Sequence, residues 1–185
     1  MRAGRYSHAM AVELPRTLRG ALAGAAAAGV WAAQQPLDKR AFGVRNDDAE
    51  LIGTAIVRGR AAIPVGTLLH LANGALFGAV YANVAPALPV PAWARGPLAG
   101  LAEQLATWPL TGVVERVHPA RDRIAPISAS RAAFWQATWR RLLFGLVLGE
   151  LERRLNAPEP EAPSLEDVFS SNGHGTLEHA TPAAS

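Results

Sequence analysis

The chain has 185 residues, of which 50% are hydrophobic, and a formal net charge of +3. This length predicts one domain, and the absence of cysteine excludes disulfides, cysteine-ligated metals and thiol catalysis. The basic residues stand at the edges of apolar segments and no basic-aromatic pattern accompanies them, so we expect a lipid bilayer as partner and no nucleic acid.

The N-terminal part of the chain divides into a polar leader and a first apolar segment. Residues 1–16 are polar and basic, and we expect them to be mobile or to lie on the membrane surface. The Gly/Ala-rich run that follows predicts a first membrane span over about 18–37, ended by Pro36 and the charged residues after it. A cleaved secretory signal within residues 1–33 is the alternative interpretation of this region.

The longest charge-free stretch of the chain, residues 61–94, predicts the second span. This span is expected over about 63–84. A charged connection, residues 38–60, precedes it and contains a short apolar piece. That piece predicts a surface helix capped by Asn46 or Asp47.

The third span is expected over about 97–114. Several prolines precede it, and they favour an extended connection because each fixes φ and removes a donor. Pro109 lies inside the span and should kink it, because the carbonyl of Leu105 loses its usual donor. At the other end of the chain, residues 156–185 are rich in Pro, Ser and acidic residues, which predicts a disordered acidic tail.

The fourth segment, over about 132–151, carries Arg140 and Arg141 in its middle. Two arginines at mid-membrane cost about 5–7 kcal/mol on insertion scales, while each Leu or Phe returns only about half a kcal/mol. The segment must therefore meet polar partners in the other spans or lie flat at the interface. We favour the buried or tilted helix.

Together these segments predict an all-α fold, an integral-membrane bundle of four helices within residues 17–155. The helices are expected over about 18–37, 63–84, 97–114 and 132–151. A soluble, Ala-rich helical bundle is the alternative, because a mean hydropathy of +0.10 suits both.

Each of the four segments carries, within it or at its edge, two glycines four residues apart. Such pairs let helix backbones touch in lipid, where apolar side chains give no drive for association. The pairs are Gly20/Gly24, Gly74/Gly78, Gly96/Gly100 and Gly145/Gly149. In the second span a stripe of small residues surrounds one imidazole: Gly66, His70, Gly74, Gly78 and Ala82. We expect close helix packing and self-association of the protein through these glycines.

A short motif around the first glycine pair recurs around the third. Arg19-Gly20-x-Leu22-Ala23-Gly24 matches Arg95-Gly96-x-Leu98-Ala99-Gly100. The match suggests two helical hairpins in tandem.

Polar groups inside the apolar segments mark the candidate site, because such groups are costly in a membrane and commonly face a partner or a water-filled cavity. They are His70, Asn73, Glu103, Gln104, Thr107, Arg140 and Arg141. We expect the second and third helices to be antiparallel neighbours, which places Asn73 and Glu103 at comparable depth, and either arginine could neutralise Glu103. One hypothesis is a site that handles protons or anions. The other, which we favour, is a structural set of ion pairs that holds the fourth helix in the bundle.

No catalytic constellation, phosphate loop or dinucleotide motif is present, so we predict no enzyme. Glu115-x-x-His118 has the spacing of a di-iron ligand pair, but such a site needs a second copy and further Glu residues. We therefore expect neither a metal nor a cofactor.

Three parts of the sequence carry a resemblance: Pro36, Asp38, Lys39 and Arg40 after the first span, the HLANGALFGAVYA run, and the RRLLFGLVLGELERR run. In this layout, residues 17–155 resemble small multi-pass bacterial membrane proteins of the YagU-like kind. The resemblance implies a location in the bacterial inner membrane and supplies no activity or site residue. We expect a structural or accessory membrane component; the alternative is a small channel or transporter with a polar intramembrane site.

Overall fold

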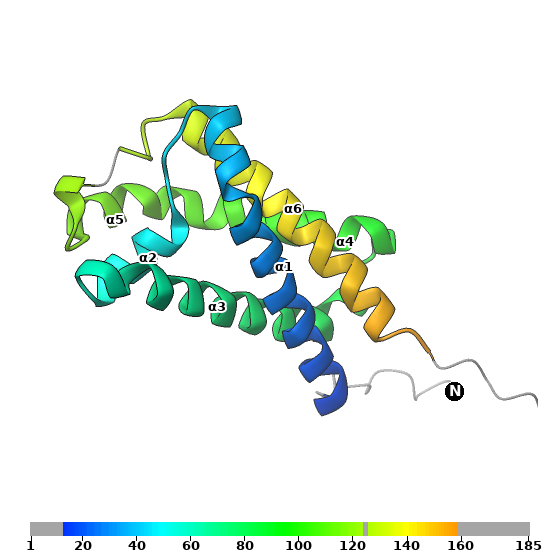
Figure 1. The fold of residues 1–185 in the computed structure, drawn as a ribbon. Helices are drawn as coiled ribbons and strands as arrows, with labels where there is room; N and C mark the ends of the chain where they lie inside the picture. Colours follow the sequence, from blue (N-terminus) through cyan, green and yellow to red (C-terminus); the bar gives the residue numbers. More distant parts are fainter. Residues whose placement is uncertain (1–12, 124–125, 159–185) are drawn as a thin grey trace, which may run out of the picture.

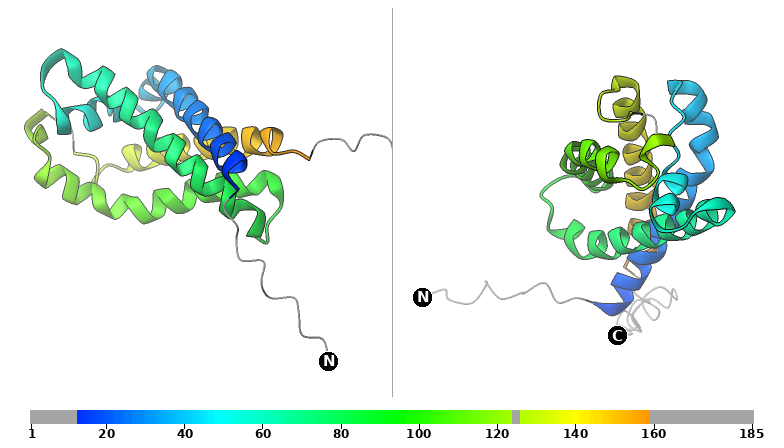
Figure 2. Two further views of the ribbon diagram at one scale, coloured as in Figure 1. Left: turned by 90° about the horizontal axis from the view of Figure 1, so that it is seen from below. Right: turned by 90° about the vertical axis from the view of Figure 1, so that its left-hand side faces the viewer.

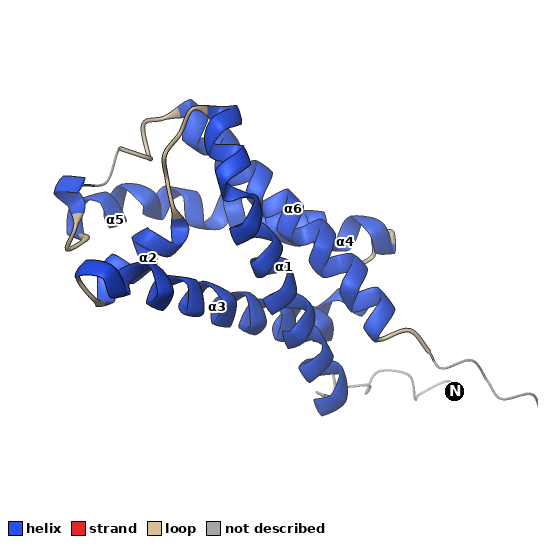
Figure 3. Cartoon of the chain, viewed as in Figure 1, coloured by secondary structure: helices blue, strands red, loops and turns tan. Residues whose placement is uncertain are grey.

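The computed structural model describes residues 13–123 and 126–158. Within these ranges the chain consists of helices joined by short loops (Figure 3). The predicted all-α fold is therefore confirmed for the described residues. The predictions of a mobile leader and a disordered acidic tail fall almost entirely on residues 1–12 and 159–185, which lie outside the described ranges.

Helix α1 (Leu14–Phe42) is longer at both ends than the predicted first span. The prediction that Pro36 and the charges after it end the helix was wrong, because α1 continues past them and stops at Gly43, whose φ of 66° is left-handed. A proline removes only one backbone hydrogen bond, and Asp38 is buried in the bundle. Arg16, assigned by prediction to the mobile leader, lies in the first turn of α1.

Helices α2 (Asp48–Ile56) and α3 (Ala62–Val84) form a tightly packed antiparallel pair. The N-cap of α2 is Asp47, one of the two residues predicted for this role. A Cβ added at Gly66 would lie 1.7 Å from the carbonyl oxygen of Ala49, so the two backbones touch. Helix α2 therefore packs into the bundle instead of lying free on its surface. Helix α3 is unbroken over the predicted second span.

The third predicted span is divided into α4 (Ala92–Thr107) and α5 (Thr111–Val117). A 3₁₀ turn, Trp108–Leu110, joins them, so the backbone changes at Pro109, the position of the predicted kink. The connection before α4 is shorter than predicted, since the helix begins directly after Pro91. Proline's fixed φ suits a helix start, and this explains the early beginning.

Helix α6 (Arg131–Leu155) extends beyond the predicted fourth segment at its C-terminal end. The hydroxyl of Ser130 caps it by accepting a hydrogen bond from the backbone N–H of Ala133 at 3.2 Å. Helix α6 packs against α1 and α4, and Arg140 is buried within it. These contacts agree with the buried helix that we favoured over the flat one.

The helices pair as two successive hairpins, α1 with α3 and α4 with α6, and α1 also lies beside α6 (Figure 1). Within the described residues α3 and α4 are not a closely packed pair, so the expectation that they are direct neighbours was wrong. Instead, α3 packs on α1 and α2. The first turn of α1 and the last turns of α6 lie at the same end of the molecule (Figure 2), where Arg16 pairs with Glu152 at 2.8 Å.

The glycine pairs face one another inside the chain. A Cβ added at Gly24 would lie 2.0 Å from the carbonyl oxygen of Gly74, where α1 crosses α3. A Cβ added at Gly96 would lie 2.0 Å from the carbonyl oxygen of Gly145, where α4 crosses α6. The pairs therefore bring helices into backbone contact within one molecule and are not free to join two molecules.

All eight paired glycines lie at helix crossings, and Gly149 is the one among them that is only half-buried. The nearest neighbour of a Cβ added at Gly149 would be the Cα of Gly96, at 3.2 Å, so no backbone oxygen blocks it as one does at the other positions. Gly149 lies one turn beyond Gly145, and two helices that cross at an angle separate on either side of their closest point. The other seven glycines are buried: Gly20, Gly24, Gly74, Gly78, Gly96, Gly100 and Gly145.

Large apolar side chains lie mainly on the outside of the bundle, while polar side chains lie within it. The largest fully buried side chains are Leu148, Gln104 and Gln136. Exposed ones include Leu18, Leu22, Ile63, Leu68, Leu76, Val80, Leu98, Leu105, Trp135 and Leu146. Among the described residues one stretch, Gly59–Ala87, is long and apolar enough to cross a membrane, and only 22% of its most apolar window is buried.

Candidate functional site

Arg140 of α6 is the centre of a buried polar network. Its Nε and Nη2 donate to the two carboxylate oxygens of Asp38, each at 2.7 Å, in a two-pronged arrangement. Its Nη1 donates to Asp48 at 2.7 Å. The side chains of Arg140 and Asp38 are only 3% and 1% exposed, so this guanidinium joins α6 to α1 and α2 away from solvent.

Further side chains complete the hydrogen bonding of the two carboxylates. Gln136 and Gln34 donate their amide N–H groups to Asp38 at 2.8 and 2.5 Å. The indole N–H of Trp31 donates to Asp48 at 3.0 Å. Since each carboxylate has several donors, the network can hold its charges within the bundle.

Arg141, the next residue, serves a different group of side chains. It forms an ion pair with Glu103 of α4, and its guanidinium carbon lies 4.5 Å from the centre of the Trp31 ring. The imidazole of His70 meets the same indole at a centroid distance of 4.9 Å, edge to face. Trp31 of α1 is thus contacted by one polar side chain from α3 and one from α6.

A small cavity of about 100 Å³ lies next to this tryptophan. His70, Asn73, Glu103 and Arg141 are its polar lining, and of these four only Asn73 is exposed. His70 is only 7% exposed, and its Nε2 has no hydrogen-bond partner among the described residues. A buried polar atom normally has a partner, and the volume suffices for several water molecules. The arrangement thus favours a hydrated cavity beside an ion pair.

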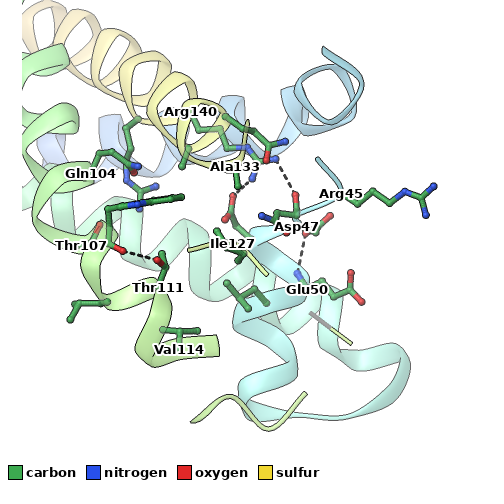
Figure 4. Close-up of a pocket in the computed structure, with 18 of the residues that line it drawn as sticks. Arg45, Asp47, Glu50, Gln104, Thr107, Thr111, Val114, Ile127, Ala133 and Arg140 are labelled. Atoms are coloured by element: carbon green, nitrogen blue, oxygen red, sulfur yellow. Dashed lines mark hydrogen bonds and ion pairs between the residues drawn. The ribbon is translucent and has the colours of Figure 1, made fainter. Parts of the chain in front are cut away.

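A larger cavity of about 530 Å³ lies between α2, the α4–α5 unit and α6 (Figure 4). Thr107, Thr111 and Gln104 line it from α4–α5, and Arg140 lines it from α6. Trp31, Asp48 and Arg141 contribute to the lining of both cavities, so these three side chains lie between the two.

The seven predicted site residues divide between the two cavities. The small cavity is lined by His70, Asn73, Glu103 and Arg141, and the large one by Gln104, Thr107, Arg140 and Arg141. Of the two arginines considered as partners of Glu103, Arg141 holds that position. The hydroxyl of Thr107 donates to the backbone carbonyl of Glu103 at 2.8 Å.

Sequence reasoning did not assign Asp38 and Asp48, the two partners of Arg140, to the site. Asp38 stood after the proline that was expected to end the first span, and Asp48 stood in a charged connection. One pattern could have found Asp38: Trp31, Gln34 and Asp38 follow at steps of three and four, which continues a single helix face past the proline.

The Glu115-x-x-His118 motif has structural contacts. The carboxylate of Glu115 accepts hydrogen bonds from the backbone and the hydroxyl of Ser128 at 2.6 and 2.5 Å. His118 accepts from the N–H of Ala120 through Nδ1, so its Nε2–H donates to the carbonyl of Leu51 at 2.9 Å. In the part of the chain that the structure describes, no group of three or more His, Asp or Glu side chains could hold a metal ion.

Comparison of the chain with models of protein families, with curated proteins and with solved structures finds no match. The resemblance to YagU-like membrane proteins therefore stays a prediction.

The cap of α2 gives a prediction about stability. Although burial raises the pKa of Asp47, the hydrogen bonds from Lys39 and from the backbone N–H of Glu50 outweigh it, so the pKa lies below its usual value. The contribution of Asp47 is then present above its unfolded-state pKa and is lost as the pH falls through the folded-state value. Asp47→Ala should lower the free energy of unfolding by about 1 kcal/mol near neutral pH.

Thermal unfolding followed by tryptophan fluorescence in detergent measures this cost. Asp47→Asn is the matched control, because asparagine also caps a helix but cannot titrate. It should keep most of the stability at pH 7 and show a smaller decrease toward pH 3 than the unaltered protein, because the contribution of Asp47 to that decrease is gone. An Asn variant as pH-sensitive as the original would contradict the assignment.

Proposed function

We propose that the chain is a multi-pass protein of the bacterial inner membrane, in which α1, α3, the α4–α5 unit and α6 cross the bilayer. Apolar side chains outside and buried polar networks inside support this proposal, because a water-soluble bundle has the opposite distribution. Helix lengths of 29, 23 and 25 residues for α1, α3 and α6 exceed the roughly 20 needed to cross the hydrocarbon core.

Within that class, we propose that the protein conducts a small solute, with protons as the first candidate, in preference to a purely structural or accessory role. The observation that carries this proposal is His70, which is buried in a cavity that Glu103 and Arg141 also line and whose Nε2 has no partner among the described residues. The network of Arg140 is saturated, as a purely structural one would be. The small cavity, in contrast, contains titratable side chains and has room for water. A path for protons requires both.

The arrangement of the helices gives further support. Tandem hairpins with polar sites between them are a common plan of membrane transporters. Helix α2 is a short element that enters the bundle only part of the way, since Asp48 at its start contacts Trp31 in the middle of α1. Such discontinuous helices are tolerated in a membrane where they line a cavity.

The test is a proton flux assay with the full chain in liposomes that have first been washed with alkaline carbonate. Carbonate removes proteins that do not cross the bilayer, so loss of the protein in the wash would support the soluble alternative. With a pH dye inside and a potassium diffusion potential, we expect proton uptake above that of protein-free vesicles. Glu103→Gln should reduce that uptake about tenfold or more, because an amide cannot carry a proton.

Glu115→Gln is the matched control. Glu115 follows on the same α4–α5 unit, but it bonds to Ser128 and does not line the small cavity. The control should leave proton uptake unchanged. Uptake no greater than in empty vesicles, or equal in the Glu103 variant and the original, would remove the conducting role and leave the structural one.

A further inference from the structure

We infer that the large cavity is a binding site for an uncharged, mostly apolar molecule that carries a hydroxyl group. This inference goes beyond the proposed function, because it holds whether or not protons cross the bundle. It concerns the space between α2, α4–α5 and α6 and not the small cavity beside His70.

The size and walls of the cavity suit a small organic molecule. Its volume of about 530 Å³ lies within the range of sites that enclose such ligands. Most of the lining surface is apolar, and two indoles, Trp31 and Trp108, contribute to it together with several aliphatic side chains, while the other lining side chains are polar or charged. The larger aliphatic side chains are Leu51, Leu110, Val114 and Ile127. An apolar ligand body would find apolar surface on several sides.

The buried charges in the lining are already compensated. Arg140 donates to two carboxylates and to a backbone carbonyl. Arg141 is paired with Glu103. Asp47 is paired with Lys39 at 2.5 Å. The other charged lining residues, Arg45 and Glu50, are exposed. In the less exposed part of the lining an ionised ligand would have to break one of these pairs, so this part favours a neutral ligand.

One face of the α4–α5 unit keeps hydrogen-bonding capacity toward the cavity (Figure 4). Gln104 is only 2% exposed, and its amide nitrogen has no hydrogen-bond partner among the described residues. Thr107 and Thr111 donate their hydroxyl protons to backbone carbonyls at 2.8 and 2.6 Å, which leaves their oxygens as acceptors. The face thus offers a donor beside acceptors.

A hydroxyl group on the ligand fits a face that offers one hydrogen-bond donor beside acceptors. Its oxygen can accept from the amide of Gln104 while its proton goes to a threonine oxygen. A carboxylate lacks the donor, and a hydrocarbon lacks both. Such an alcohol could enter from the bilayer or from water, and the chemistry of recognition is the same in the two cases.

The test measures quenching of tryptophan fluorescence by brominated probes, with the full chain in phosphatidylcholine nanodiscs. Trp93, Trp135 and Trp139 do not line the cavity and are replaced by Phe, so that Trp31 and Trp108 report. The probes 12-bromododecanol, 1-bromododecane and 12-bromododecanoate share chain and bromine and differ in the head group. We expect saturable quenching by the alcohol at about five- to tenfold lower concentration than by the other two.

Two glutamine variants test the assigned donor. Gln104→Met keeps the side-chain volume and should remove the preference for the alcohol over the alkane. Gln35→Met is the control, because Gln35 is also buried with an unpartnered amide atom but does not line the cavity. It should keep the preference. Thermal unfolding of both variants shows whether they fold.

The protein that keeps both Gln104 and Gln35 tests the inference even if a glutamine variant fails to fold, because the order in which the three probes quench it can still be measured. Equal quenching by alcohol and alkane, or tighter binding of the carboxylate, would overturn it. A preference that survives in folded Gln104→Met would also overturn it. If the alcohol is preferred, a further probe distinguishes the source of the ligand. Quenching by 12-bromododecanol but not by the water-soluble 6-bromohexanol indicates a ligand from the bilayer, and equal quenching by both indicates a ligand from water.

Discussion

Replacing Arg140 by methionine should lower the free energy of unfolding by about 3–5 kcal/mol. The substitution leaves Asp38 in place, 1% exposed and without the guanidinium that meets both of its oxygens. Asp48 loses its partner at 2.7 Å at the same time. A buried carboxylate without a charged partner is among the most costly groups in a protein. The substitution should therefore weaken the packing of α6 against both α1 and α2.

Chemical unfolding in detergent, followed by tryptophan fluorescence, measures this effect. Arg153→Met is the control on the same helix. Arg153 is exposed and pairs with Glu150 at the surface, so its replacement should change the stability little. Adding Asp38→Asn and Asp48→Asn to the Arg140 variant should recover part of the loss, since no buried charge then stays unpaired. An Arg140 variant as stable as the Arg153 variant would show that the network does not hold the bundle together.

The second large effect is expected at the crossing of α1 and α3. Gly24→Ala should destabilise the protein by about 1–3 kcal/mol, because a Cβ there would lie 2.0 Å from a backbone oxygen of Gly74 that cannot move alone. Gly29→Ala, on the same helix, meets only a leucine methyl at 3.8 Å. It should instead stabilise by about 0.5–1 kcal/mol through its higher helix propensity.

Thermal unfolding of the two variants side by side gives the sign of each change. Since both substitutions add one methyl group to α1, opposite signs would locate the close approach at Gly24 alone. Two changes of the same sign and size would mean that α1 and α3 are not in backbone contact at this crossing.

Much of the helical arrangement followed from periodicity and glycine spacing. Helix α3 matches its prediction closely, because no charge or proline interrupts residues 65–85. The stripe of small residues at steps of four, including His70, is the face of α3 that the structure buries. Spacing alone could not separate Gly149 from the buried glycines, because its partial exposure depends on where α4 and α6 cross. The break at Pro109 could be predicted, because a missing backbone donor acts locally.

The centre of the site could not be predicted, because it depends on tertiary contacts. Asp38 is followed by Lys39 and Arg40, and such a charged run ordinarily indicates exposure. Only the position of Arg140, opposite it on a distant helix, explains its burial. The separation of α3 from α4 could not be predicted from the sequence either, because a short connection normally joins neighbouring helices. The small cavity lies between these two helices, since His70 of α3 and Glu103 of α4 both line it.

The Arg16–Glu152 pair has a consequence for topology. It joins the beginning of α1 to the end of α6 at 2.8 Å. If the four proposed segments cross a bilayer, this even number of crossings returns the chain to the side from which it started. The start of α1 and the end of α6 would then face one compartment, and reporter fusions at the two termini should report the same compartment.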